Sequence, residues 1–190
     1  MLMEDTAYLT NNTIYLKKLT IDDISEKYLN WVNDKVVTDF LEIRHKNHNR
    51  EDLINYVKSF DSDNSHFLFG VFLIDTNEHI GNGTLYNVNY IHRTFDIGYL
   101  IGEKKYWGTT VSLETVLILL KFGFDKLKMR KMIGGVYANH IKSRFTLKRL
   151  GFSEEARLKE KFIYNGKSVD EIIYSLTDNQ WYELRKKYNL

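Results

Sequence analysis

The sequence predicts an α/β (α+β) fold in a single domain spanning residues 1–190. Strand-type patterns occur in seven segments, and the three segments between Phe67 and Ile101 follow one another closely, as in a meander. Segments with helical spacing, such as Arg50–Phe60, separate most of the others. With 190 residues, 43% of them hydrophobic, the chain can bury a core without disulfides or metal. The expected order is strand, helix, helix, three strands, helix, strand, helix and two strands.

The first half begins with Thr13–Leu19, where apolar and polar residues alternate as in a strand with one wet face. Thr20 or Asp22 can cap a helix that continues to about Val32. A second helix is expected at Arg50–Phe60, because its apolar residues share one helical face.

The second half combines a meander, two helices and a closing hairpin. The apolar run near Gly134 and Gly135 is typical of a buried strand, and Gly151 is suited to end a helix. The turn N-G-K favours a tight hairpin. The expected strands are Phe67–Ile74, Ile80–Tyr90, Thr94–Ile101, Lys131–Ala138, Ser153–Tyr164 and Ser168–Leu176, and the expected helices are Val111–Phe124, Ile141–Leu150 and Thr177–Tyr188.

The composition argues against several classes of function. The chain has no cysteine, which excludes disulfides, thiolate metal sites and a cysteine nucleophile, and no metal site is expected. The net charge of +2 comes from interleaved acids and bases, so no nucleic-acid partner is expected. Neither a signal peptide nor a membrane-spanning stretch is evident, which favours a cytoplasmic protein without a membrane partner. Edge strands and the last helix make a homodimer plausible.

One run, from Asp96 to Glu114, carries most of the functional information: D-I-G-Y-L-I-G-E-K-K-Y-W-G-T-T-V-S-L-E. It predicts a strand, a short loop with a glycine and the start of an apolar helix. Backbone N–H groups at a helix start have no intrahelical acceptor and lie at the positive end of the helix dipole. The run is therefore a candidate binding site for a phosphate or pyrophosphate.

The element order and three motifs resemble the GCN5-related N-acetyltransferase (GNAT) family, in particular its RimJ/RimL-like branch. The segment G-Y-L-I-G-E-K-K-Y-W-G-T-T-V-S-L-E-T-V is similar to the acetyl-CoA loop of this branch. The segment N-H-I-K-S-R-F-T-L-K-R-L-G-F, from Asn139 to Phe152, is similar to its second cofactor element, and I-Y-L-K-K-L-T-I-D-D-I fits its opening. The resemblance implies a GNAT fold, with a mixed, mostly antiparallel sheet of six to seven strands flanked by helices.

The resemblance also implies an activity, the transfer of an acetyl group from acetyl-CoA, as co-substrate, to a primary amine by a bacterial-type enzyme. The acceptor stays open between a protein N-terminus, a polyamine or amino acid, an antibiotic, and an amino sugar carried on a nucleotide. Two alternatives remain: a catalytically silent protein of this fold that binds a ligand, and a protein-interaction module that uses an edge strand.

For the cofactor, the resemblance implies that backbone groups of Leu100 and Ile101 pair with pantetheine, while N–H groups of the following loop hold the pyrophosphate. The chain departs from the family pattern because Thr110 and Ser112 replace a glycine and a small residue. A threonine hydroxyl could instead cap the helix, and both interpretations stay open. The cofactor-binding candidates are Leu100, Ile101, Trp107, Gly108, Thr109, Thr110, Val111, Ser112, Asn139 and Ser143.

For catalysis, a proton must leave the acceptor ammonium and another must reach the leaving thiolate. The resemblance implies Asp96 as the proton acceptor, although a surface ion pair would explain an acid there equally well. Many family members use a tyrosine as the thiolate's acid where this chain has Leu147. Ser143 is the candidate for that role, or it is a helix-start hydroxyl that bonds local backbone. His140 could contact pantetheine or relay a proton, or it is a surface group.

For the acceptor, the long connection Asn33–Asn49 is of interest because long connections are often functional. Within it, Arg44 could bind a phosphate or carboxylate, or it could be an exposed surface charge. The substrate-binding candidates are Trp31, Phe40, Arg44, Tyr86 and Tyr164, although aromatic residues are as common in a core as in a pocket.

Overall fold

The computed structural model describes residues 8–10, 13–62 and 64–190. The chain divides into two compact units, the first made of Met1–Val88 and Ile97–Leu119 and the second of Asn89–Asp96 and Leu120–Leu190. The strand β5 (Thr94–Ile101) and the helix α3 (Val111–Lys121) each begin in one unit and end in the other.

The first unit contains the strand order β1-β2-β3-β4-β5. The pairs β1–β2, β2–β3 and β3–β4 are antiparallel. Every residue of β3 is buried, which explains why this strand reads as an unbroken apolar run. The short β1 is an addition to the seven expected strands. The bounds are β1 (Tyr8–Thr10), β2 (Ile14–Lys18), β3 (Phe67–Leu73) and β4 (His79–Asn89).

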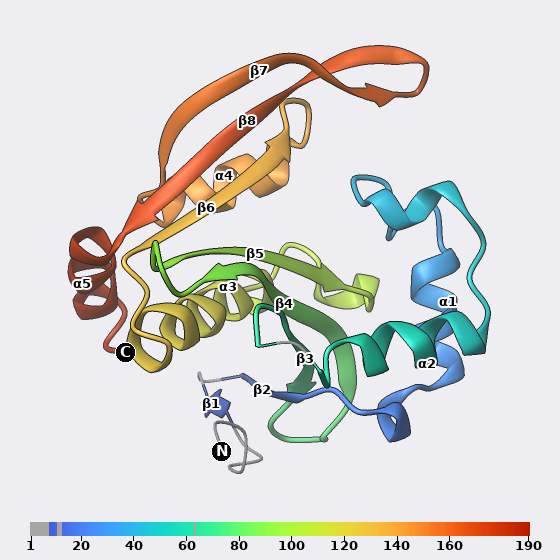
Figure 1. Ribbon diagram of the computed structural model, residues 1–190. Coiled ribbons are helices and arrows are strands. Elements are labelled where there is room, and N and C mark those ends of the chain that lie inside the picture. The colour runs from blue at the N-terminus through green and yellow to red at the C-terminus, as the bar shows by residue number, and fades with distance from the viewer. Residues whose placement is uncertain (1–7, 11–12, 63) are drawn as a thin grey trace. The chain divides into compact units, whose positions relative to one another are not determined.

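Two helices of this unit, labelled α1 and α2 in Figure 1, each begin at a side-chain cap. In α1 (Glu26–Asn33), the Ser25 side chain accepts a hydrogen bond from the backbone N–H of Tyr28. In α2 (Arg50–Ser59), Asn49 and Asp52 exchange hydrogen bonds as a capping box. Such caps satisfy N–H groups that have no acceptor within the helix.

The prediction of one helix from Thr20 or Asp22 to Val32 is wrong for its first turn. Thr20 and Asp23 bond to each other and close a separate 3₁₀ turn, η1 (Ile21–Asp23). Ile24 then has extended backbone angles, so α1 starts afresh after Ser25. The sequence holds two capping signals in succession, and both are used.

The α1 and α2 helices pack on the first unit's sheet through one buried cluster. Its members are large apolar side chains from both helices, from the segments before and between them, and from β3. They are Leu19, Ile24, Tyr28, Trp31, Val32, Val37, Leu53, Val57, Leu68 and Phe72.

The helix expected at Val111–Phe124 also ends differently. It is α-helical to Lys121 and continues as a π-helical segment, η4 (Phe122–Lys126). A methyl group on Gly123 would lie 2.4 Å from the Phe95 ring, so glycine permits the close approach of this segment to β5. Such widened turns are not encoded in apolar spacing alone.

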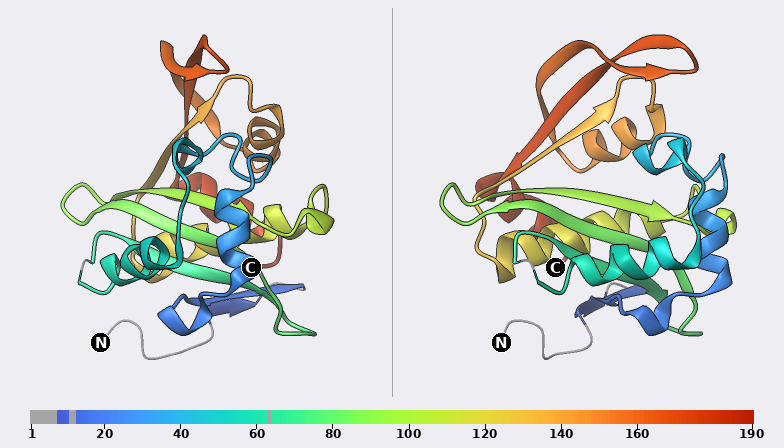
Figure 2. Two further views of the ribbon diagram at one scale, coloured as in Figure 1. Left: turned by 90° about the vertical axis from the view of Figure 1, so that its right-hand side faces the viewer. Right: turned by 45° about the vertical axis from the view of Figure 1, so that its right-hand side comes forward.

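The second unit contains the strand order β5-β6-β8-β7 (Figure 1). The β5–β6 pair is parallel, whereas β6–β8 and β7–β8 are antiparallel. A mixed, mostly antiparallel sheet is thereby confirmed. The long β7–β8 hairpin is visible in every view (Figure 2), and it turns at Asn165 and Gly166, which both have positive φ. The bounds are β6 (Lys131–Tyr137), β7 (Ser153–Tyr164) and β8 (Lys167–Thr177).

Two helices complete the second unit, α4 (Ile141–Arg149) and α5 (Asp178–Lys187). Thr177 caps α5, and the Trp181 indole donates to Asp125 at 2.8 Å. In the part of the chain that the structure describes, no helix has both the length and the apolar character needed to cross a membrane.

Candidate active site

The loop between β5 and α3 is fastened to the strand that precedes it. After Ile101 the chain makes a 3₁₀ turn, η3 (Lys104–Tyr106), and then reaches Trp107. The Trp107 indole N–H donates to the carbonyl oxygen of Ile101 at 2.8 Å, and its ring packs against the buried cluster. Trp107, which precedes Gly108 and is one of the predicted cofactor-binding residues, thus positions the loop through its side chain.

Gly108 carries the left-handed conformation of this loop. Its φ is +78°, and a methyl group built on it would meet nothing within 4 Å. Thr110 is not among the residues with positive φ, so its β-branched side chain causes no strain of that kind. The departure from the family pattern at Thr110 is therefore compatible with the backbone of the loop.

The Thr110 hydroxyl does not cap α3. It donates to Oε1 of Glu114 at 2.7 Å, and the same carboxylate also accepts from the backbone N–H and the hydroxyl of Thr13, at 3.2 and 3.1 Å. Glu114 is only 7% exposed, so these three donors satisfy an otherwise costly buried charge.

Some N–H groups at the start of α3 are left for another acceptor. The Thr109 hydroxyl is 3.3 Å from the N–H of Val111, so the capping interpretation holds for that one group. Glu114 N–H donates to the Thr110 carbonyl. For Ser112 and Leu113, no acceptor occurs among the described residues. Two adjacent uncapped donors at the positive end of a helix fit a phosphate.

At the end of β5, the structure distinguishes Leu100 from Ile101. A methyl group on Gly81 would lie 2.2 Å from the Leu100 carbonyl oxygen, which is therefore directed toward β4. Successive residues of a strand direct their backbone groups to opposite edges, so those of Ile101 face away from β4. The Ile101 N–H is thus on the edge that a ligand could approach, whereas the Leu100 carbonyl faces β4, and the pairing of either residue with a cofactor stays a prediction.

The parallel ladder of β5 with β6 is short. Its register joins Thr94 to Lys131 and Phe95 to Met132, which are the first two residues of each strand. Among the described residues, no further ladder pair of these two strands is found.

The catalytic candidates all lie in the second unit. Asp96 is a half-buried residue of β5. His140 is the N-cap residue of α4, and its side chain makes no capping hydrogen bond. Asn139 lies in the exposed turn before His140. Ser143 is half-buried in the first turn of α4. Leu147, at the position of the expected tyrosine, is buried in the core.

Arg144 holds this turn in place, and sequence reasoning did not single it out. Its Nη1 donates to the carbonyl of Ala138 at 2.6 Å, while its buried Nε has no partner among the described residues. The arginine therefore ties α4 to the end of β6 next to Asn139 and His140. No motif in the sequence signals this contact.

The acceptor candidates are divided between the units. Tyr164 ends β7 in the second unit, with its ring centroid 6.3 Å from that of Tyr137. In the first unit, Phe40 is half-buried, and Tyr86 lies 3.5 Å from a methyl group built on Gly98. Arg44 donates from Nη1 to the carbonyls of Asp39 and Leu41, at 3.1 and 3.3 Å, so it organises its own loop.

Trp31 is a core residue rather than an open pocket wall. It is 5% exposed, and its indole N–H donates to Glu103 at 3.1 Å. A methyl group on Gly102 would lie 2.0 Å from the Trp31 ring, so the glycine lets the loop after β5 rest on the tryptophan.

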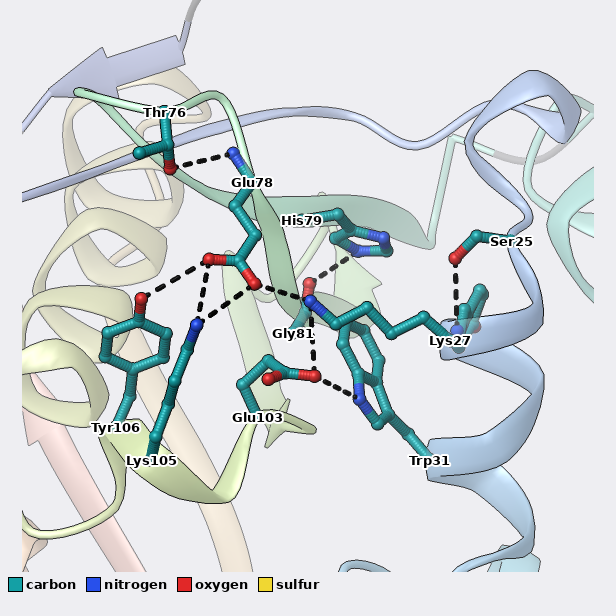
Figure 3. A network of polar contacts seen from close by, with 11 residues as sticks. Ser25, Lys27, Trp31, Thr76, Glu78, His79, Gly81, Glu103, Lys105 and Tyr106 are labelled. Carbon is teal, nitrogen blue, oxygen red and sulfur yellow. Dashed lines mark hydrogen bonds and ion pairs between the residues drawn. The ribbon is translucent and has the colours of Figure 1, made fainter.

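A network of charged residues surrounds this contact (Figure 3). Lys27 reaches Glu78 at 2.6 Å and Glu103 at 3.2 Å, and Lys105 reaches Glu78 at 3.2 Å. The hydrogen bond from Lys27 is the main cause that lowers the pKa of Glu78. Burial disfavours the charged form of Lys27, but its bonds to the two glutamates outweigh burial and raise its pKa. The network links α1, the β3–β4 turn and η3, and so fixes the loop before α3.

Within the described residues, no group of histidine, cysteine, aspartate or glutamate side chains could hold a metal ion. The first unit thus offers backbone donors on a fixed loop, and the second unit offers polar side chains around the turn into α4.

Comparison with known proteins identifies the class. Residues 13–153 match the family model described as "Acetyltransferase (GNAT) domain". The chain therefore belongs to the GNAT acetyltransferase family. At the level of this family, it is an N-acetyltransferase that uses acetyl-CoA as co-substrate.

Individual relatives are distant. YdaF of Bacillus subtilis (strain 168) is 28% identical over 98 residues, 52% of this chain and 53% of YdaF. The [Ribosomal protein uS5]-alanine N-acetyltransferase of Escherichia coli (strain K12) is 25% identical over 130 residues, 67% of this chain and 66% of that enzyme. The chain thus spans between half and two thirds of the length of these two relatives.

Solved structures confirm the fold. The spermidine N-acetyltransferase from Vibrio cholerae, solved in complex with CoA and spermine, superposes with a TM-score of 0.81. Its sequence is 22% identical, and the match covers 90% of this chain and 99% of that one.

Proposed function

We propose that the protein acetylates a primary amine of a small molecule or of a protein N-terminus, and that residues 1–190 act as a single acetyltransferase domain. The observation that carries the proposal is the start of α3, where the N–H groups of Ser112 and Leu113 lack an acceptor among the described residues. Gly108 adds an open left-handed turn directly before them. These groups would bind the cofactor's pyrophosphate.

The end of β5 and the turn into α4 would complete the cofactor site. The Ile101 N–H, on the edge away from β4, would pair with the pantetheine amide or stabilise the developing oxyanion. Asn139 and Ser143 would contact the pantetheine arm. When bound, acetyl-CoA supplies the acetyl group as a reactive thioester.

Proton transfer would fall to residues of the second unit. Asp96 would accept the proton of the acceptor ammonium, directly or through a water, so that the neutral amine can attack. Ser143 would protonate the leaving thiolate, with His140 as the second candidate. A cytoplasmic location, a bacterial-type enzyme and a homodimer remain predictions.

The test is acetyl-CoA-dependent release of free thiol with a panel of amines that includes spermidine and a peptide with an N-terminal alanine. Asp96→Asn is expected to lower kcat by about 100-fold or more, which is the usual contribution of a general base. Asp75→Asn, an exposed acid in the β3–β4 turn, is the control and should leave kcat unchanged. Full activity of Asp96→Asn would remove Asp96 from the mechanism.

A second candidate is a catalytically silent protein that binds acetyl-CoA without turnover. The buried Leu147 favours it, because the core closes over the position where many relatives carry their acid. Acetyl-CoA binding without thiol release for any amine in the panel would favour this candidate over the enzyme.

A further inference from the structure

One face of the β6, β7 and β8 strands combines apolar side chains with the half-buried carboxylate of Glu171. The β6–β8 register pairs Tyr137 with Glu171 and Gly135 with Ile173, so these four residues share a face. The β7–β8 register places two more aromatic residues on the same face. We call this set the hairpin face: Ile133, Gly135, Tyr137, Phe162, Tyr164, Glu171 and Ile173.

The hairpin face is partly open, whereas on the opposite face the middle of β8 is buried. Gly135 is exposed, and Ile133 and Ile173 are half-buried. On the opposite face, Ile172 and Tyr174 are 0% exposed. A ligand could therefore reach the hairpin face at these residues but not the side chains of Ile172 and Tyr174 behind them.

Glu171 lies across the bare backbone of Gly135. A methyl group built on Gly135 would be 1.9 Å from Glu171 Oε1 and 2.7 Å from its carboxyl carbon. The carboxylate thus occupies the volume that any larger residue at position 135 would fill. Glu171 belongs to β8, and its carboxylate lies against β6 at Gly135. The β6 strand leads directly into the turn of Asn139 and His140.

The Glu171 carboxylate has no partner of its own. No hydrogen bond or ion pair to it occurs within the part of the chain that the structure describes, although the residue is half-buried. Lys131, on the same face, is already paired with Glu155 at 2.5 Å. Lys167 lies on the same face at the exposed hairpin tip. A half-buried, unpaired carboxylate favours a cation from outside the chain.

Aromatic side chains border this carboxylate. The Tyr137 and Phe162 rings stack with centroids 4.0 Å apart at 13°, and Tyr164 stands at the edge of Tyr137. Aromatic faces and a carboxylate together suit an ammonium group attached to a hydrocarbon chain. An acceptor with a diphosphate would instead meet like charge.

We infer that Glu171, held over Gly135, binds a positively charged group of the acceptor other than the amine that is acetylated. The acceptor is then an amine with a second positive charge, of the diamine or polyamine class, and not a nucleotide-linked sugar. This inference rests on the proposed acetyltransferase function. Glu171 is in this role a specificity-determining residue.

The test measures the Kd of spermidine by calorimetry with the full chain saturated with CoA. Glu171→Gln removes the charge at constant shape, and Gly135→Ala displaces the carboxylate while keeping its charge. Both are expected to weaken spermidine binding by about tenfold, since one ion pair in a partly open site is lost. Glu154→Gln, on the opposite face of the same hairpin, is the charge-matched control and should stay within about twofold of wild type.

The outcomes separate the inference from the function on which it rests. Unchanged spermidine binding in Glu171→Gln would overturn the inference, and so would a wild type that does not bind spermidine. In both cases, binding of CoA would still support the proposed acetyltransferase function. An equal loss for hexylamine, which has one amine only, would also overturn it, because the carboxylate would then hold the reacting group. Failure to bind CoA itself would instead refute the proposed function.

Discussion

Thr110 stands at the start of α3, where its hydroxyl donates to the buried carboxylate of Glu114 at 2.7 Å. Because this hydroxyl is engaged, it leaves the N–H groups of Ser112 and Leu113 uncapped. Sequence alone could not decide between a capping threonine and a phosphate site, since the deciding partners, Glu114 and Thr13, come from different parts of the chain. The family pattern has a glycine where this chain has Thr110, but the positive φ of the loop falls at Gly108.

Thr110→Val tests this role at nearly constant shape. The buried Glu114 carboxylate would keep its two bonds from Thr13 but lose the third, so the free energy of unfolding should fall by about 1–3 kcal/mol. Urea unfolding measures the change. Thr146→Val, a half-buried position on α4 whose hydroxyl donates to the Lys142 carbonyl of the same helix, is the control and should change stability by less than about 0.5 kcal/mol. Equal stability of Thr110→Val and wild type would show that Glu114 does not need this donor.

At the scale of elements, apolar spacing predicted the strands and helices closely, and β5 and β7 have the expected bounds. The errors occur where a local side-chain contact outweighs periodicity. Thr20 and Asp23 close a separate turn before α1, and Gly123 allows a π-helical end after α3 beside Phe95. Contacts between distant residues decide such details, and a one-dimensional pattern does not contain them.

Gly102 shows how one element positions another. A side chain there would meet the Trp31 ring at 2.0 Å, so Gly102→Ala should destabilise the protein by about 1–3 kcal/mol through overpacking. Gly98→Ala is a matched control on β5, because its methyl group would lie at an ordinary 3.5 Å from Tyr86. Denaturant unfolding of the two variants compares them. If Gly102→Ala and Gly98→Ala were equally stable, the loop after β5 would not depend on its packing against Trp31.

For the whole molecule, the fold class, the order of most elements along the chain and the family followed from the sequence, whereas the contacts of the individual candidate residues did not. Motif spacing located the loop before α3 and the turn into α4. It did not show that Trp31 is buried, that Arg44 bonds to its own loop, or that Arg144 and Glu171 border the second unit's candidate residues. Those facts depend on side-chain packing between segments far apart in the chain.

The measurement that tests the account most directly is the melting temperature of the full chain with and without acetyl-CoA. At a concentration 100 times Kd, a ligand that binds only the folded state adds about 2.7 kcal/mol. For a chain of this size, the melting temperature should then rise by about 5–10 °C. No rise at saturating acetyl-CoA would contradict the assignment of the loop from Gly108 to Leu113 as the cofactor site.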